Sequence, residues 1–214
     1  MNIKFLKIAL GLAFTAVAFN ASAQKNYTQG TITYSLEAGG TQTDSKVYFT
    51  ADSSASVTQY GPANIKLLTN NKATYMAVFV DVPVASIKKV AVFTPDEIDQ
   101  AMAGVPKFTF TSGTETKQIN GFNCKSVTAK DSKSGSSYII WITTDIKAPS
   151  NIMSKSFEDA GGFPVQFTTT KQGQTVNITL KSITEDKAPA GTFGIPPGYD
   201  KISLDDLKAM SGGK

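Results

Sequence analysis

The 214-residue chain contains no histidine and no arginine, and all 21 of its basic residues are lysine. Without histidine, neither a Ser-His-Asp triad nor a Cys-His pair can form, and the usual zinc and copper ligand sets are missing. Without arginine, no planar guanidinium can bind a carboxylate or phosphate through two parallel hydrogen bonds. These absences exclude most common hydrolase, metalloenzyme and phosphoryl-transfer designs. We therefore expect a protein that is not an enzyme and has no metal and no cofactor.

Cysteine is almost as scarce, since Cys124 is the only one. A lone thiol cannot close an intramolecular disulfide, and a nucleophilic thiol would need a pKa well below about 8.5. Only Lys117, Lys125 or a helix N-terminus is available to lower it. In a regular strand Cys124 shares a face with Phe122 and points into the core. We interpret it as a structural thiol, with intermolecular pairing or a reactive thiol as the alternatives.

The first 23 residues have the layout of a secretory signal peptide. Lys4 and Lys7 precede an apolar run at 8–19, and the small residues Ala21-Ser22-Ala23 follow it. This run is shorter than the roughly 20 residues of a membrane-spanning helix. Cleavage after Ala23 would leave no cysteine at the new N-terminus to carry a lipid. The prediction is a protein of the periplasm or one that is secreted, not a lipoprotein, with no transmembrane helix in the mature chain.

The mature chain, residues 24–214, keeps a formal charge of only +2. This excess is too small to indicate nucleic acid as a partner. A length of 191 residues suits a single domain with a sizeable core. The sequence leaves the oligomeric state open.

Short segments rich in β-branched and aromatic residues follow one another from Tyr27 onward, bounded by Gly, Asn, Asp, Ser or Pro. In Thr31–Leu36, alternation places Ile32, Tyr34 and Leu36 on one face. We predict about ten or eleven antiparallel strands, with Tyr138–Ile142 central because it is apolar on both faces. The predicted strands are 31–36, 46–50, 56–60, 64–69, 74–82, 88–93, 107–111, a strand-forming stretch within 115–130, 136–143, 163–170 and 174–183.

Three short helices are predicted between or after these strands. The first begins at the N-cap Thr94, with Pro95 at the first helical position and Glu97 completing a capping box, and ends at Gly104. The second covers about 150–160, with Met153 and Phe157 four residues apart. The third covers 203–210 and has a capping box at its start. The expected fold class is mainly β with short helices (α+β): a curved antiparallel sheet or incomplete barrel.

The aromatic side chains are the remaining signal of function. In one interpretation they fill a packed β core. In the other, a strongly curved sheet with few helices leaves an apolar cleft on its concave face, beneath a lid that includes residues 95–103. The residues predicted to line this cleft and lid are Tyr34, Phe49, Tyr75, Phe79, Ile98, Met102, Phe108, Phe110, Trp141, Phe157 and Phe167.

Several segments resemble an uncharacterised family of secreted bacterial domains of unknown function. They are ETKQINGFNCKSV (115–127), WITTDI (141–146), GGFPVQF (161–167) and APAGTFGIPPGYDKIS (188–203). That family looks related to the LolA/LolB-like lipoprotein carriers, whose fold is an incomplete antiparallel barrel with a helical lid over a hydrophobic cavity. The resemblance implies a single LolA-like domain at 24–214. Carriers of this type use an arginine in closing the lid and this chain has none, so holding an apolar ligand is implied more directly than active shuttling.

Three classes of function remain open. The first is a periplasmic, non-enzymatic binding protein for an apolar ligand, such as a lipid acyl chain or a lipoprotein, with transient contact to the membrane surface. The second is an envelope interaction or scaffold protein with a solid core. The third is a histidine-free hydrolase, which would require a pocket holding a perturbed lysine or a carboxylate pair. The S-x-x-K spacing of Ser86 and Lys89 is expected by chance in a chain this rich in both residues. We favour the first.

Overall fold

The computed structural model describes residues 24–171 and 173–210, so the predicted signal peptide lies outside the described residues. The chain is mainly β, as predicted, with two short α-helices, α1 (Pro95–Ala103) and α2 (Leu204–Met210), and two 3₁₀ helices, η1 (Pro83–Ala85) and η2 (Lys155–Ala160). The strands are β1 (Lys25–Asn26), β2 (Gly30–Ala38), β3 (Thr41–Phe49), β4 (Ser53–Tyr60), β5 (Ala63–Asn70), β6 (Met76–Val82), β7 (Ile87–Val92), β8 (Phe108–Ile119), β9 (Phe122–Asp131), β10 (Ser137–Thr143), β11 (Ile146–Lys147), β12 (Phe163–Lys171), β13 (Gln174–Thr184) and β14 (Asp200–Ile202).

Twelve strands form one curved, open sheet in the order β14-β7-β6-β5-β4-β3-β2-β13-β12-β10-β9-β8. Neighbours pair antiparallel except β14 and β7, which are parallel. The sheet therefore has one strand more than the upper limit of the prediction. β10 is an interior strand, but it is third from the β8 edge rather than central.

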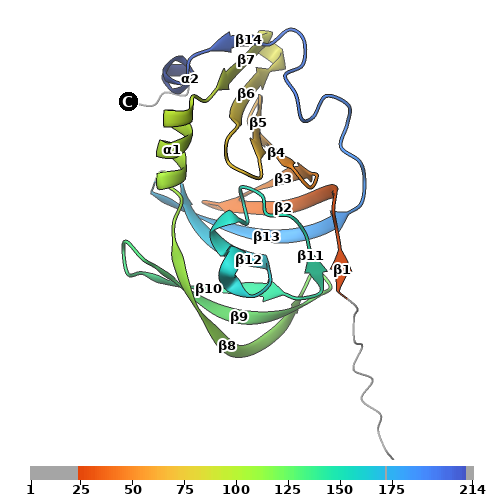
Figure 1. The fold of residues 1–214 in the computed structure, drawn as a ribbon, viewed down its shortest axis with the longest axis vertical. Helices are drawn as coiled ribbons and strands as arrows, with labels where there is room; N and C mark the ends of the chain where they lie inside the picture. Colours follow the sequence, from red (N-terminus) through yellow and green to blue (C-terminus); the bar gives the residue numbers. More distant parts are fainter. Residues whose placement is uncertain (1–23, 172, 211–214) are drawn as a thin grey trace, which may run out of the picture.

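The connections explain how the sheet wraps around its own inner face. Strands β2 to β7 follow one another as hairpins, and α1 then leads the chain to the opposite edge, where β8 begins (Figure 1). From there β8, β9, β10, β12 and β13 return to pair with β2. The 148–162 loop, which contains η2, lies inside this curve (Figure 1).

Alternation along the strands gives the inner face an apolar lining. On β2, Tyr34 pairs with Ser45 of β3 and with Leu180 of β13, and all three side chains are fully buried. The largest fully buried side chains of this inner core include Ile32, Val47, Phe49, Val127, Ile140, Ile142 and Val165. Since each contributes about 1.5 to 3 kcal/mol when fully buried, this layer holds the two halves of the sheet together.

The outer face of β4 to β7 is covered by the segment at 187–199. Phe193, Ile195 and Tyr199 pack against a second core of Ala55, Leu68, Ala77, Phe79 and Val90. Lys66 fixes this segment, because its Nζ donates to the carbonyl oxygens of Thr192 at 3.3 Å and Gly194 at 3.2 Å. The same ammonium lies 3.8 Å from the centre of the Phe79 ring.

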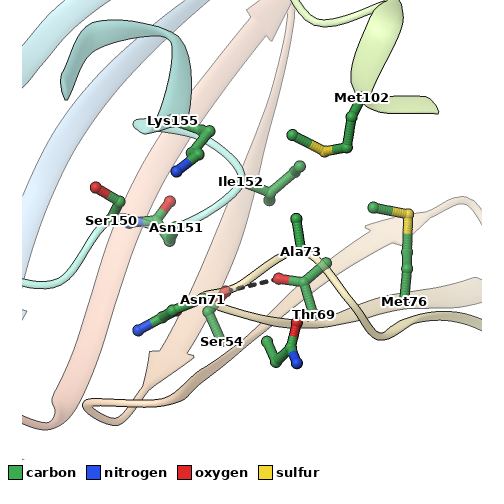
Figure 2. A pocket seen from close by; sticks show the side chains of 11 residues that line it. Ser54, Thr69, Asn71, Ala73, Met76, Met102, Ser150, Asn151, Ile152 and Lys155 are labelled. Carbon is green, nitrogen blue, oxygen red and sulfur yellow. Dashed lines mark hydrogen bonds between the residues drawn. The ribbon is translucent and has the colours of Figure 1, made fainter. Parts of the chain in front are cut away.

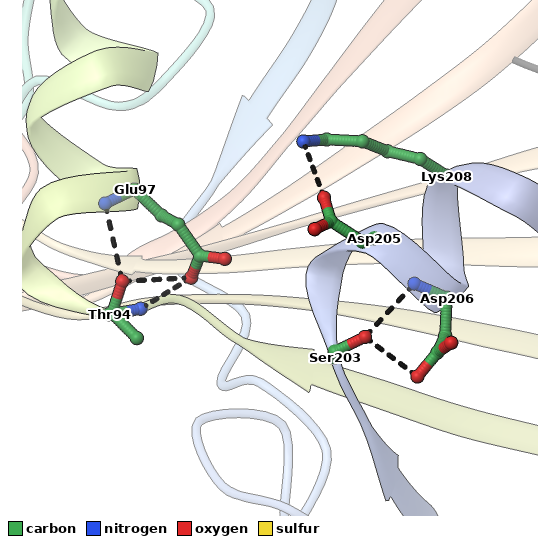
Figure 3. A network of polar contacts seen from close by, with 6 residues as sticks. All are labelled: Thr94, Glu97, Ser203, Asp205, Asp206 and Lys208. Carbon is green, nitrogen blue, oxygen red and sulfur yellow. Dashed lines mark hydrogen bonds and ion pairs between the residues drawn. The ribbon is translucent and has the colours of Figure 1, made fainter. Parts of the chain in front are cut away.

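Local capping fixes both α-helices where the sequence predicts them (Figure 3). The Thr94 hydroxyl accepts from the Glu97 amide at 3.3 Å, and a Glu97 carboxylate oxygen accepts from the Thr94 amide at 2.7 Å. At the start of α2, the Ser203 hydroxyl accepts from the Asp206 amide at 3.0 Å. The segment at 150–160 differs from the prediction, because only 155–160 is helical and the helix is of the 3₁₀ type.

Candidate functional site: an apolar cleft under the 148–162 loop

An open cleft of about 500 Å³ lies between the end of α1, the 148–162 loop and the inner face of the sheet. Phe108 of β8, Phe157 of the loop and Phe167 of β12 provide its aromatic lining. The other lining residues are Ala101, Gly104, Val105, Pro106, Asp131, Tyr138, Ile152, Met153, Ser156, Thr168, Thr169, Thr170 and Ile178. With a single charged side chain, Asp131, the lining is predominantly apolar.

The aromatic rings of the cleft are packed against one another. Phe157 stacks on Phe108 with 5.5 Å between ring centres and an interplanar angle of 4°. It also contacts Phe167, with ring centres 4.7 Å apart. Phe110 and Tyr138 extend the group, at 6.2 Å and 6.3 Å from the Phe108 ring. This arrangement makes Phe157 the link between the loop and the sheet.

Four residues predicted for the cleft, Phe108, Phe110, Phe157 and Phe167, are thus brought together on the inner face. Phe108, Phe157 and Phe167 line the cleft, and Phe110 does not. Tyr34 and Phe49 share this face but are fully buried, and they are not among the described residues that line the cleft. They form part of the closed core beside it.

Phe79 and Tyr75 were predicted in the same cleft, and this placement is wrong. The residues paired with Phe79 across β5, β4 and β3 lead to Thr33 of β2, so Phe79 and Thr33 lie on the same face of the sheet. Thr33 adjoins Tyr34 and points to the other face. Phe79 therefore lies on the outer face, where the Tyr199 ring packs edge-on at 5.3 Å, and Tyr75 packs against the same outer core.

Trp141 also lies outside the predicted cleft. It alternates along β10 with the buried Ile140 and Ile142, so its ring points to the outer face. There the Lys117 ammonium lies 4.0 Å from the centre of the ring and donates to the Gln166 side chain at 2.9 Å. The polar neighbours fit an outer-face position.

The predicted lid at 95–103 is corrected by the structure. Ala101 at the end of α1 forms part of one wall of the cleft, Met102 lines a neighbouring small pocket, and Ile98 is buried with 4% of its surface exposed. The element that supplies Ile152, Met153 and Phe157 to the cleft is the 148–162 loop. The loop is therefore the cover, and α1 is a side wall.

Hydrogen bonds within the loop give the cover its shape. Asn151 opens a tight turn. Its side-chain Oδ1 accepts from the backbone amide of Met153 at 2.9 Å, and its backbone amide donates to the Ser154 hydroxyl at 3.0 Å. Lys155 pairs with Glu158 at 2.9 Å. Burial acts to raise the pKa of Glu158, but hydrogen bonds with Ser150 and Lys155 outweigh burial and lower it.

A second, smaller pocket of about 30 Å³ lies beside the cleft, and Ile152 lines both (Figure 2). Most of its accessible lining surface is apolar, although seven of the eleven lining residues are polar in type: Ser54, Thr69, Asn70, Asn71, Ser150, Asn151 and Lys155, with Ala73, Met76, Met102 and Ile152. Two buried polar atoms of this region, the Tyr34 hydroxyl and Asn151 Nδ2, make no hydrogen bond within the described part of the chain. Burial raises the pKa of Tyr34 far above its usual range, and the Asn151 side chain, which lies close enough to interact with this hydroxyl, opposes the rise only in part.

A third space, of about 600 Å³, opens on the other side of the loop. Ile146, Lys147, Gly161, Phe163 and Pro164 are among its lining residues, and Phe157 lines it too. Phe157 therefore separates this groove from the aromatic cleft. The side chain that links the loop to the sheet also divides two open spaces.

Cys124 is buried, as expected of a structural thiol, with 3% of its surface exposed. Burial raises the pKa of its thiol to about 11, and its Sγ donates to the Phe122 carbonyl at 3.4 Å.

In the S-x-x-K spacing, Lys89 is paired with Asp200 at 2.8 Å. Within residues 24–171 and 173–210, no group of three His, Cys, Asp or Glu side chains could hold a metal ion. No helix of these ranges is long and apolar enough to cross a membrane.

Residues 21–199 match the family described as Domain of unknown function (DUF4412). The chain belongs to the DUF4412 family. This match confirms the resemblance to a family of domains of unknown function that was based on segments such as 115–127 and 188–203. No curated protein matches this DUF4412 chain.

Solved structures supply weak likenesses to this DUF4412 protein. PNGF-II in a C2 crystal form is 16% identical, with a TM-score of 0.50, over 85% of this chain and 32% of the PNGF-II chain. Its P2₁ crystal form is 17% identical, with a TM-score of 0.48, over 86% of this chain and 33% of the PNGF-II chain. LprF from Mycobacterium bovis is 14% identical, with a TM-score of 0.34, over 79% of this chain and 90% of the LprF chain. The chain spans about a third of the length of PNGF-II, and that likeness shows the fold alone.

Asn151, Ser54 and Thr69 were not predicted as site residues. Asn151 is in the stretch SNIMS, where it reads as an ordinary helix-capping or turn residue. Only the tertiary structure places its side chain opposite the hydroxyl groups of β4 and β5.

Proposed function

We propose that this protein is a non-enzymatic binding protein of the cell envelope that holds an apolar chain, such as a lipid acyl chain or the acyl part of a lipoprotein, in the cleft under the 148–162 loop. The observation that carries the proposal is the open 500 Å³ cleft with three phenylalanines on its lining. Small-molecule sites commonly measure roughly 300 to 1,000 Å³ and combine an apolar lining with few polar groups.

The energetics support a ligand of this type. Each buried methylene group contributes about 0.8 kcal/mol, so eight of them would contribute about 6 kcal/mol before the cost of ordering the chain. No catalytic group is required for such binding. The predicted signal peptide and the absence of histidine and arginine favour a carrier or sensor over an enzyme.

A binding titration with a fluorescent fatty acid tests the proposal. Phe108→Lys places a charge in the cleft and should weaken binding at least tenfold. Ile139→Lys is the matched control, because Ile139 is apolar and lies on β10, two strands from β8, but is 55% exposed. Equal affinity in the wild type and Phe108→Lys, or no binding by the wild type, would contradict the proposal.

The scaffold interpretation is the second candidate, and the β8 edge favours it. Residues 111–118 of this edge strand are exposed, so their outer backbone groups could pair with an extended partner segment. Crosslinking in the native envelope separates the two functions. Under the scaffold interpretation, a protein partner is captured equally well by the wild type and Phe108→Lys.

A further inference from the structure

The aromatic cleft opens beside an exposed apolar hairpin end. We call residues 104–107 and 130–139 the cleft mouth; its turn between β9 and β10 extends from the molecule on the side where α1 ends (Figure 1). Tyr138 and Ile139, at the start of β10, are 37% and 55% exposed, and no other two consecutive large apolar side chains of the described residues are both exposed. Tyr138 and Val105 also line the cleft. A group of exposed apolar side chains beside an open cleft indicates a contact surface, whereas a single one does not.

Both faces of this hairpin end are apolar. Tyr138 faces the cleft, where its ring lies 6.3 Å from that of Phe108. Ile139 lies between Tyr138 and the buried Ile140 on the strand, so its side chain points to the outer face. A flat protein surface would cover only one of these faces. A fluid lipid layer can surround a projecting hairpin and take up both side chains.

The cleft mouth also carries an excess of positive charge. Lys107, Lys130 and Lys133 are exposed, and the Ser132 amide donates to the Lys107 carbonyl at 2.9 Å, which joins the two segments. Asp131 is the acidic residue of these segments, and its Oδ1 accepts from two backbone amides of the turn at 2.7 and 3.1 Å. The local excess of two positive charges equals the formal charge of the whole mature chain.

We propose that the cleft mouth docks on an anionic lipid bilayer, with Tyr138 and Ile139 between the head groups and the three lysines on the lipid phosphates. Lysines close to an anionic surface are attracted to it, and apolar side chains that enter the interface add to the binding. This inference rests on the proposed function and names the partner with which the cleft exchanges its apolar chain. With the mouth on the bilayer, the chain passes between lipid and cleft without crossing water.

Vesicle flotation measures the docking, with neutral phosphatidylcholine vesicles compared with an equimolar mixture containing phosphatidylglycerol. The wild type should bind the anionic vesicles at least about tenfold more strongly, and high salt should weaken this binding. Lys107→Gln combined with Lys130→Gln should lower it about 25-fold, because each lysine near an anionic surface contributes about fivefold. Lys187→Gln combined with Lys201→Gln is the matched control, since it removes the same charge from exposed sites outside the mouth.

Ile139→Ser tests the apolar contact. It should weaken docking about fivefold, because only the exposed part of the side chain is available for burial. Val84→Ser is the control, since Val84 is 83% exposed on η1, between β6 and β7. A polarity-sensitive dye on Ile139→Cys should shift to the blue on anionic vesicles, and the same dye on Val84→Cys should not. The native Cys124 is buried and does not compete for the dye.

A titration with fluorescent fatty acid in solution, without vesicles, separates this inference from the proposed function. Ile139→Ser and the Lys107/Lys130 variant should keep this binding, since none of these residues lines the cleft. Equal binding of the wild type to both kinds of vesicle, or equal losses in the mouth variants and their controls, would refute the docking surface and leave the cleft intact. A protein crosslinked through Ile139→Cys without any vesicle binding would refute it as well. Vesicle binding as expected, with no fatty acid bound in solution, would refute the proposed function and support the bilayer contact alone.

Discussion

Phe157 is the residue whose replacement tests the cleft most sharply. Its ring links the 148–162 loop to β8 and β12 and separates the 500 Å³ cleft from the 600 Å³ groove. Two replacements grade the perturbation. Phe157→Leu removes the ring but keeps an apolar side chain, and Phe157→Ala removes nearly all of it.

The size of the effect on stability follows from the packing. Phe157 is buried and takes part in two ring pairs, each worth about 0.5 to 1.5 kcal/mol beyond area burial. Phe157→Leu should therefore lower the free energy of unfolding by about 1 to 3 kcal/mol. Phe157→Ala should lower it by about 3 to 5 kcal/mol, as for other buried phenylalanines.

The same replacement should also change which acyl-chain length the protein prefers. Without the ring, the cleft and the groove join, and a longer acyl chain can be buried at about 0.8 kcal/mol per methylene. Phe157→Ala should therefore shift the preference from dodecanoic acid toward octadecanoic acid by several-fold. Urea denaturation measures the stability and competition binding measures the preference, with Ile139→Ala at an exposed site as the control. A loss below 1 kcal/mol for Phe157→Ala, with an unchanged chain-length preference, would refute the assigned role of the ring.

Three further predictions concern single groups. Tyr34→Phe removes a buried hydroxyl that has no partner in the described structure, so the urea midpoint should stay the same or rise; a loss above about 1 kcal/mol would mean that the hydroxyl is hydrogen-bonded. The Cys124 thiol, with its pKa raised to about 11, contributes stability in full below about pH 8.5, and this stability is lost as the pH rises toward 11. The wild type should therefore lose stability over that interval more steeply than Cys124→Ala, and parallel curves would contradict the assignment. Thr94→Ala removes the capping hydroxyl of α1 and should cost about 0.5 to 2 kcal/mol in thermal or urea unfolding; a smaller change would show that the box is not stabilising.

Features set by neighbouring residues could be predicted from the sequence. The capping box at Thr94 was predicted correctly, because its partner lies three residues away. At Ser203 the hydroxyl caps the Asp206 amide as predicted, but the Asp206 carboxylate accepts from that hydroxyl instead of closing the box on the Ser203 backbone amide. The inner-face position of Tyr34 was predicted by alternation on β2. The turn at Asn120 and Gly121, where both φ angles are positive, is a hairpin signal of the same local kind.

Features set by distant segments could not be predicted. Phe79 alternates as a core residue should, but the segment that covers it comes from 187–199, more than a hundred residues later. Trp141 is apolar by composition, yet its neighbours across the sheet are Lys117 and Gln166. The 148–162 loop acts as the cover because of the Asn151 turn. The spacing of Met153 and Phe157, four residues apart, favoured a regular helix there instead.

Photocrosslinking tests the central claim most directly. A fatty acid with a photoreactive diazirine near its tail, irradiated with the wild-type protein and mapped by mass spectrometry, reports where the apolar chain lies. The account predicts labelling of Ile152, Met153, Phe157 or Phe167 that an excess of unlabelled fatty acid suppresses. Labelling confined to the outer face around Phe193 and Tyr199, or labelling that excess fatty acid leaves unchanged, would contradict it.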